Sequence, residues 1–156
     1  MLKYCLGKWE KYKGELEKDI RQDTTLNECD YLYLVQKIVS IILNGGEDEH
    51  GDRWSAEKIT EIDNGDYQGT LLFLIPKDTY QPSEYEYLMT FVNYGSCSGC
   101  DTLQAIQDWG EKKLVESQVR DFMTLCRDLV CSIIKPYNKG WREEPEFETI
   151  EYNPKD

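Results

Sequence analysis

The sequence predicts an α+β domain, in which an antiparallel β-hairpin or small sheet packs against four or so helices. Apolar residues recur every three or four positions in residues 2–21, 26–43 and 115–135, as they do on the buried face of a helix. A compact apolar run (69–76) and an alternating segment (84–95) flank turn residues, which is typical of a hairpin. With 156 residues and 40% hydrophobic content, the chain is long enough to bury one core, so we expect a single domain over 1–156.

The two N-terminal helices are expected to form an αα-hairpin. The second should end at Gly45-Gly46, because glycine suits a helix end. Residues 47–66 are rich in acidic side chains and are expected to be a mostly irregular connection. After the β-hairpin, a short helix should reach about Trp109, and Pro136 should end the long helix 115–135.

Packing of the hairpin on the long helix follows from their apolar positions. We expect one hairpin face to lie against the stripe of that helix that contains Phe122. The hairpin residues expected on that face are Leu71, Phe73, Ile75, Met89 and Phe91. Residues 141–156 are expected to be an acidic C-terminal tail or an edge strand.

The charge of the chain narrows the class of partner. Thirty acidic residues against 18 basic ones give a formal net charge of −12. Such a charge disfavours direct binding to nucleic acid or to an anionic membrane and favours a basic protein surface. The candidate partner-binding residues are Glu47, Asp48, Glu49, Asp52, Glu61, Asp63, Asp66, Glu143, Glu144 and Glu146. No export signal or membrane-spanning segment is expected, which predicts a cytoplasmic protein.

Six cysteines are expected to be reduced, because disulfide frameworks belong mainly to short secreted domains that lack a core. Cys5 and Cys29 fall on helical apolar stripes and are interpreted as small core residues. Cys97 and Cys100 differ, because they form a Cys-x-x-Cys turn between a predicted strand and a predicted helix.

The Cys97–Cys100 turn has three interpretations. Over residues 87–106 it is similar to the strand, dithiol and helix of thioredoxins, which implies a redox pair, and Ser98 with Asp101 is expected to cap the helix. Zinc is an alternative cofactor, with Cys97 and Cys100 joined by Cys126 or Cys131 and by His50. The favoured interpretation is a structural turn that depends on Gly95 and Gly99, with no cofactor.

The string Tyr94-Gly-Ser-Cys-Ser-Gly-Cys-Asp-Thr-Leu-Gln104, with Tyr67-Gln68-Gly69 upstream, resembles a motif of uncharacterised small proteins encoded by bacteriophages. The resemblance covers residues 66–135 and carries no known activity. It implies a phage setting in the cytosol of a bacterial host.

Together with the charge, the resemblance leads to the hypothesis of an accessory protein that inhibits a host nucleic-acid-handling or defence protein. Its acidic surface would mimic nucleic acid in a basic groove, as in an anti-CRISPR protein bound to a CRISPR effector nuclease. A thiol-disulfide oxidoreductase or redox switch is the alternative, and a zinc-stabilised interaction module is the third hypothesis. No pattern in the sequence requires an enzyme.

Overall fold

The computed structural model describes residues 1–46 and 52–136 of the chain. Its elements in chain order are α1 (Leu2–Gln22), the 3-10 turn η1 (Leu26–Glu28), α2 (Tyr31–Lys37), the π-helical turn η2 (Ile38–Leu43), β1 (Thr60–Asp63), β2 (Gly69–Pro76), β3 (Tyr87–Tyr94), α3 (Thr102–Ile106) and α4 (Glu116–Cys131). The strands form one antiparallel sheet in the order β1-β2-β3. The α+β class predicted from the sequence is confirmed.

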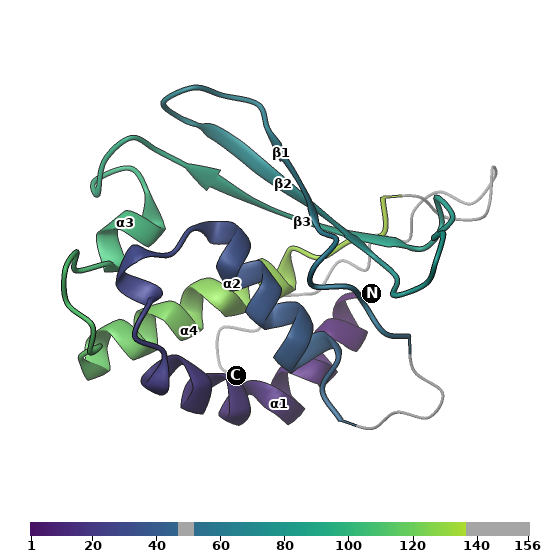
Figure 1. The fold of residues 1–156 in the computed structure, drawn as a ribbon, viewed down its shortest axis with the longest axis horizontal. Helices are drawn as coiled ribbons and strands as arrows, with labels where there is room; N and C mark the ends of the chain where they lie inside the picture. Colours follow the sequence, from purple (N-terminus) through teal and green to yellow (C-terminus); the bar gives the residue numbers. More distant parts are fainter. Residues whose placement is uncertain (47–51, 137–156) are drawn as a thin grey trace.

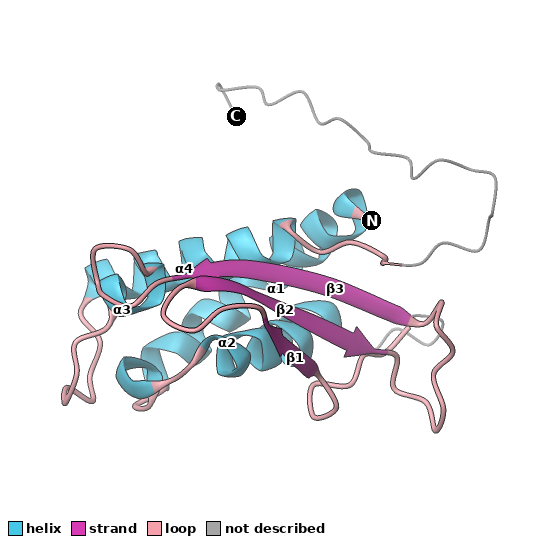
Figure 2. Ribbon diagram, turned by 90° about the horizontal axis from the view of Figure 1, so that it is seen from above, coloured by secondary structure: helices cyan, strands magenta, loops and turns pink. Residues whose placement is uncertain are grey.

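The molecule has two layers, with the helices gathered on one face of the sheet (Figures 1 and 2). α1 lies against α4 and against η2, and α4 contacts β3. The buried positions of α1 are spaced by three or four residues, so a single stripe of the helix faces the core. These positions are Cys5, Trp9, Tyr12, Leu16 and Ile20.

The sheet presents alternate residues of each strand to the helices, as strand geometry requires. Leu71, Phe73 and Ile75 of β2 are buried on this inner face. In β3 the buried residues are Leu88 and Thr90, and Thr90 Oγ1 donates a hydrogen bond of 2.7 Å to the carbonyl oxygen of Leu129.

The predicted inward orientation of Met89 and Phe91 is therefore wrong. Met89 pairs with Leu74 and Phe91 pairs with Leu72, so all four side chains lie on the outer face, away from the helices. The inward positions of β3 include the polar residue Thr90, whereas Met89 and Phe91 on the outer face are apolar. A prediction from residue type alone therefore selects the wrong face of β3 as the buried one. The hairpin itself is confirmed, with eight paired positions from Gly69↔Tyr94 to Pro76↔Tyr87.

Two further expectations need correction. The helix predicted over 26–43 is divided, because the Asp30 side chain accepts a hydrogen bond from Tyr33 N and starts α2 at Tyr31. Strand β1 lies within the segment predicted to be irregular, and none of its four residues is buried. Its sequence therefore lacks the buried alternation by which strands are recognised.

Within residues 1–46 and 52–136, no helix combines the length and apolar character needed to cross a membrane. The tail predicted over 141–156 lies outside the described residues.

Candidate functional site

The segment from Gly95 to Gln104 connects β3 to α3 and carries the Cys-x-x-Cys turn. Cys100 N donates a hydrogen bond of 3.0 Å to the Cys97 carbonyl oxygen, which closes the turn. Both cysteines are exposed, and their Sγ atoms are 3.0 Å apart. The turn therefore brings two thiols together at the surface.

The environment of Cys100 favours its thiolate. A hydrogen bond from the Cys97 thiol, followed by interactions with the backbone of Cys97 and with Ser96, holds the pKa of Cys100 below its usual range. The thiolate is the nucleophilic form of cysteine, so a lowered pKa increases the nucleophilic fraction of Cys100 at a given pH.

Asp101, immediately after the turn, is buried, with only 5% of its surface exposed. Its carboxylate accepts three hydrogen bonds of 3.0 Å, from Tyr31 Oη, from Gly95 N and from Gln104 N. Tyr31 Oη in turn accepts a hydrogen bond from Leu103 N. One carboxylate thus ties both ends of the turn to α2.

The expected capping pair of Ser98 and Asp101 is wrong. Asp101 is itself the N-cap of α3, and it caps through Gln104 N. The signal was present, because Asp101-x-x-Gln104 has the spacing of a capping box. No local signal could have found Tyr31, which is 70 residues away in sequence.

Gly95 and Gly99 differ in what they contribute. A Cβ atom at Gly95 would lie 2.5 Å from Cys100 Sγ and 2.6 Å from the Cys100 carbonyl oxygen, so only glycine fits there. A Cβ atom at Gly99 would be 3.8 Å from Cys97 Sγ, and Gly99 is not among the residues with positive φ. The expectation that the turn requires glycine holds for Gly95 and not for Gly99.

The far end of α3 is also anchored to the helical layer. Asn27 of η1 is buried. It accepts hydrogen bonds from Asp108 N and Gln118 Nε2 and donates one to the Glu111 carbonyl oxygen. Gln107 Nε2 donates to the carbonyl oxygens of Leu26 and Cys29. Hydrogen bonds to the helical layer therefore hold the chain both at the Cys97–Cys100 turn and beyond the end of α3.

The pKa values of the remaining cysteines shift in the opposite direction to that of Cys100, although Cys131 is exposed as Cys97 and Cys100 are. Burial raises the pKa of Cys5 to about 11 and those of Cys29 and Cys126 to about 12. Partial burial of its sulfur also raises the pKa of Cys131. Lowered thiol reactivity is expected wherever a sulfur is taken away from water.

The residues suggested as zinc ligands do not gather in the described part of the chain. No group of three or more His, Cys, Asp or Glu side chains there is arranged to hold a metal ion. Cys126 is fully buried, whereas Cys97 and Cys100 are exposed. His50 lies outside the described residues.

The candidate acidic residues divide between two places. Asp52 forms an ion pair of 2.9 Å with Lys77. Glu61 and Asp63 lie on the same side of β1, and Asp66 follows in the β1–β2 turn. Partial burial, Asp30 and Asp63 together raise the pKa of Glu61, while a hydrogen bond from Tyr94 Oη, followed by one from Gly65 N, lowers the pKa of Asp63.

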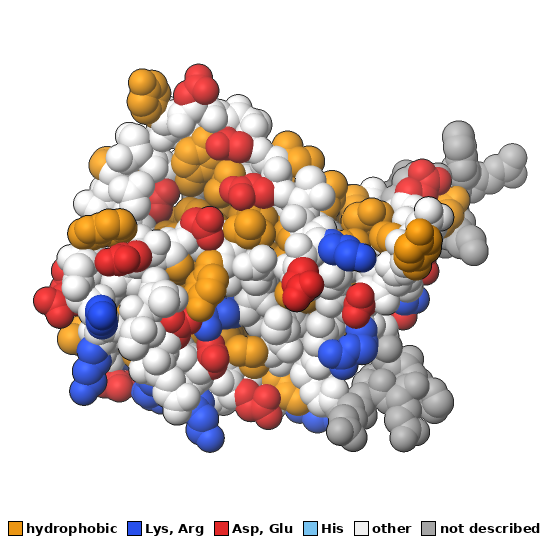
Figure 3. Space-filling view, in the orientation of Figure 1, with side chains coloured by type: hydrophobic (Ala, Val, Ile, Leu, Met, Phe, Trp, Pro, Cys, Tyr) orange, Lys and Arg blue, Asp and Glu red, His pale blue; other side chains and the backbone are white. Residues whose placement is uncertain are grey.

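Figure 3 shows acidic side chains interspersed with hydrophobic ones over the part of the surface where the β1–β2 hairpin lies in Figure 1. Of the predicted partner-binding residues, Glu61, Asp63 and Asp66 belong to this hairpin. The other candidate acidic residues, Glu47, Asp48, Glu49, Glu143, Glu144 and Glu146, lie outside the described residues.

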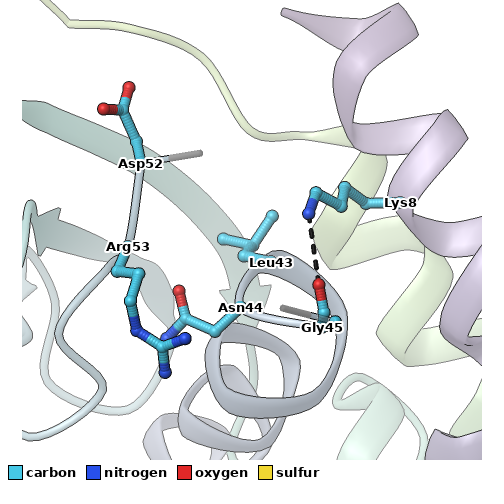
Figure 4. Close-up of a pocket in the computed structure, with 7 residues that line it drawn as sticks. Lys8, Leu43, Asn44, Gly45, Asp52 and Arg53 are labelled. Atoms are coloured by element: carbon cyan, nitrogen blue, oxygen red, sulfur yellow. Dashed lines mark hydrogen bonds between the residues drawn. The ribbon is translucent and has the colours of Figure 1, made fainter. Parts of the chain in front are cut away.

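A small pocket lies between α1 and the end of η2 (Figure 4). Lys8 Nζ donates a hydrogen bond of 3.3 Å to the Gly45 carbonyl oxygen at its side. The other residues that line the pocket are Leu43, Asn44, Gly46, Asp52 and Arg53. Its volume of about 10 Å³ accommodates no more than one water molecule. This pocket is therefore too small for a substrate.

Comparisons with protein-family models, with curated proteins and with solved structures find no match to this chain.

Proposed function

We propose that Cys97 and Cys100 form a reversible disulfide and make the protein a thiol-disulfide redox switch or oxidoreductase. The observation that carries the proposal is the 3.0 Å separation of two exposed Sγ atoms. The same contact is the largest cause of the lowered pKa of Cys100, which makes the attacking thiolate easier to form.

The reaction balances with a second disulfide, R–S–S–R, as the oxidant. The Cys100 thiolate attacks one sulfur of that disulfide, forms a mixed disulfide and releases the first R–S⁻. Cys97 then gives its proton to solvent and attacks Cys100 Sγ, which forms the Cys97–Cys100 bond and releases the second R–S⁻. Two electrons pass from the cysteine pair to the incoming disulfide, and the released thiolates take protons from solvent.

The support beneath the turn suits this chemistry. The groups that hold the segment are Asp101, Tyr31 and the backbone N–H of Gly95, and none of them is a sulfur. A change of bonding between the sulfurs can therefore leave the anchoring hydrogen bonds in place.

Trapping the mixed disulfide tests the order of attack. In Cys97→Ser, Cys100 is expected to react with glutathione disulfide and to retain the glutathione, because no second thiol resolves the adduct. Cys100→Ser should form less adduct under the same conditions, and Cys131→Ser serves as the matched control with an intact pair. Equal adduct formation in the two single variants would contradict the assignment of Cys100 as the attacking residue.

A second candidate function is binding to a basic surface of a host protein, such as a CRISPR effector nuclease, in a phage setting. The specific observation that favours it is the group of Asp30, Glu61 and Asp63. Partial burial, followed by the nearby charges of Asp30 and Asp63, raises the pKa of Glu61. Neighbouring carboxylates attract a basic partner at long range, and salt screens that attraction.

Capture of purified CRISPR effector nucleases at low and high salt tests this candidate. The variant Glu61→Gln with Asp63→Asn and Asp66→Asn should capture less nuclease at low salt, and binding by the wild type should fall as salt rises. Capture that is the same for both proteins and at both salt concentrations would contradict it.

A further inference from the structure

The centre of the outer face of the sheet is apolar and is not covered by any described helix. Ile62, Leu72 and Phe91 form one row across the three strands. Leu74 and Met89 form the next row beside Thr60, and the polar pair Thr70 and Asn93 borders the first row on its other side. Ile62 and Phe91 are 43% and 42% exposed. Figure 2 looks onto this face, with the helices behind the sheet. Clustered exposed apolar side chains of this kind mark a surface that is normally covered.

The apolar surface continues to the end of the described chain. Ile134 exchanges two backbone hydrogen bonds of 2.8 Å with Met89, as an antiparallel partner does. Directly opposed residues share a face, so Ile134 extends the row of Leu74 and Met89, and it is 46% exposed. The described chain ends two residues later, at Pro136.

We propose that residues 137–156 pack onto this outer face. This segment starts at the border of the patch and carries apolar side chains of its own. They are Tyr137, Trp141, Phe147, Ile150 and Tyr152. Twenty residues span up to roughly 66 Å when extended, whereas three strands are about 15 Å wide, so the segment is long enough to cross the sheet.

Two arguments favour the chain's own segment over a second copy. A tethered segment acts at an effective concentration on the order of millimolar, far above that of a second molecule in dilute solution. The formal net charge of −12 also opposes association between two copies. This inference does not depend on the chemistry of Cys97 and Cys100.

Hydroxyl-radical labelling of the full chain, read out by peptide mass spectrometry, tests the inference. In the variant Phe147→Asp with Ile150→Asp and Tyr152→Asp, labelling of Met89 and Phe91 should rise several-fold over the wild type. The matched control adds three negative charges at polar positions of the same segment, Asn138→Asp, Thr149→Asp and Asn153→Asp, and should label like the wild type. Melting curves verify that all three proteins stay folded.

Three results would overturn the inference. Equal labelling of Met89 and Phe91 in the wild type and the apolar variant means that the segment does not cover them. An equal rise in the charge control assigns the effect to charge. Wild-type labelling that falls with protein concentration, together with a dimer in sedimentation, assigns the face to a second copy.

Discussion

The sulfur atoms of the Gly95–Gln104 segment and the groups that hold it in place differ in almost every respect. Cys97 and Cys100 are exposed and touch each other, whereas Asp101 and Tyr31 are buried and bind the backbone on both sides of the turn. In the proposed function the first pair reacts with a disulfide, while the second pair holds the turn in place. Adjacent residues then have two roles, with stability assigned to the Asp101 carboxylate and chemistry to the sulfurs.

Asp101→Ala should have the largest effect on stability, because it removes the hydrogen bonds that hold the turn in place. It removes the acceptor of three hydrogen bonds and leaves the N–H of Gly95 and the hydroxyl of Tyr31 without this partner. Because buried donors lose their charged acceptor, the free energy of unfolding should fall by about 3–5 kcal/mol. Urea unfolding measures it, and a loss no larger than that of an exposed Asp→Ala variant such as Asp121→Ala would reject the role of Asp101.

Gly95→Ala should have an intermediate effect on stability and should also disturb Cys100. Its new methyl group would meet Cys100 Sγ and the Cys100 carbonyl oxygen, so the free energy of unfolding should fall by about 1–3 kcal/mol. Gly99→Ala is the matched control and should change stability by about 0.5 kcal/mol or less, because its Cβ has space. Equal losses in the two variants, measured by thermal unfolding, would mean that the close approach at Gly95 is not limiting.

The double variant Cys97→Ser with Cys100→Ser should leave the melting temperature unchanged, because both side chains are exposed and bind no other described element. It should no longer form the intramolecular disulfide when it is treated with glutathione disulfide. Calorimetry measures the melting temperature, and intact mass measurement detects the disulfide. A lower melting temperature would show that the sulfurs stabilise the fold.

The smallest expected effect is a difference in the pH at which two thiols react. Hydrogen bonds lower the pKa of Cys100, and burial raises that of Cys131. Alkylation of Cys100 by iodoacetamide should therefore reach half of its maximal rate at a lower pH than alkylation of Cys131 does. The thiolate fraction rises as pH passes the pKa, which fixes the sign. Peptide-resolved mass spectrometry of the reduced protein measures both rates, and coincident pH profiles would contradict the difference.

The parts of the fold that sequence reasoning predicts well are those with a repeated apolar pattern. The stripe of α1 and the run of β2 each carry their own burial signal, so their limits agree closely with the structure. β1 carries no such signal, because Glu61 and Asp63 occupy its inner side and remain exposed. Its strand conformation comes from pairing with β2, which no local pattern encodes.

The candidate site divides in the same way. Cys97 and Cys100 are found by their spacing, because the residues that react are neighbours in sequence. Tyr31 and Asn27 are missed, since their hydrogen bonds join positions 70 or more residues apart. The sequence identifies Gly95 as a turn residue, but the reason it must be glycine is the position of Cys100 Sγ, which only the folded chain provides.

The most direct test of the redox proposal is equilibration of the wild-type protein with glutathione buffers of graded redox potential, followed by acid quenching and peptide mapping. We predict a two-electron transition in which a disulfide between Cys97 and Cys100 forms and is fully reversed by reduced glutathione, while Cys5 and Cys126 stay reduced. A protein in which Cys97 and Cys100 both remain free thiols across the whole range, or carry only separate glutathione adducts, would contradict the proposal.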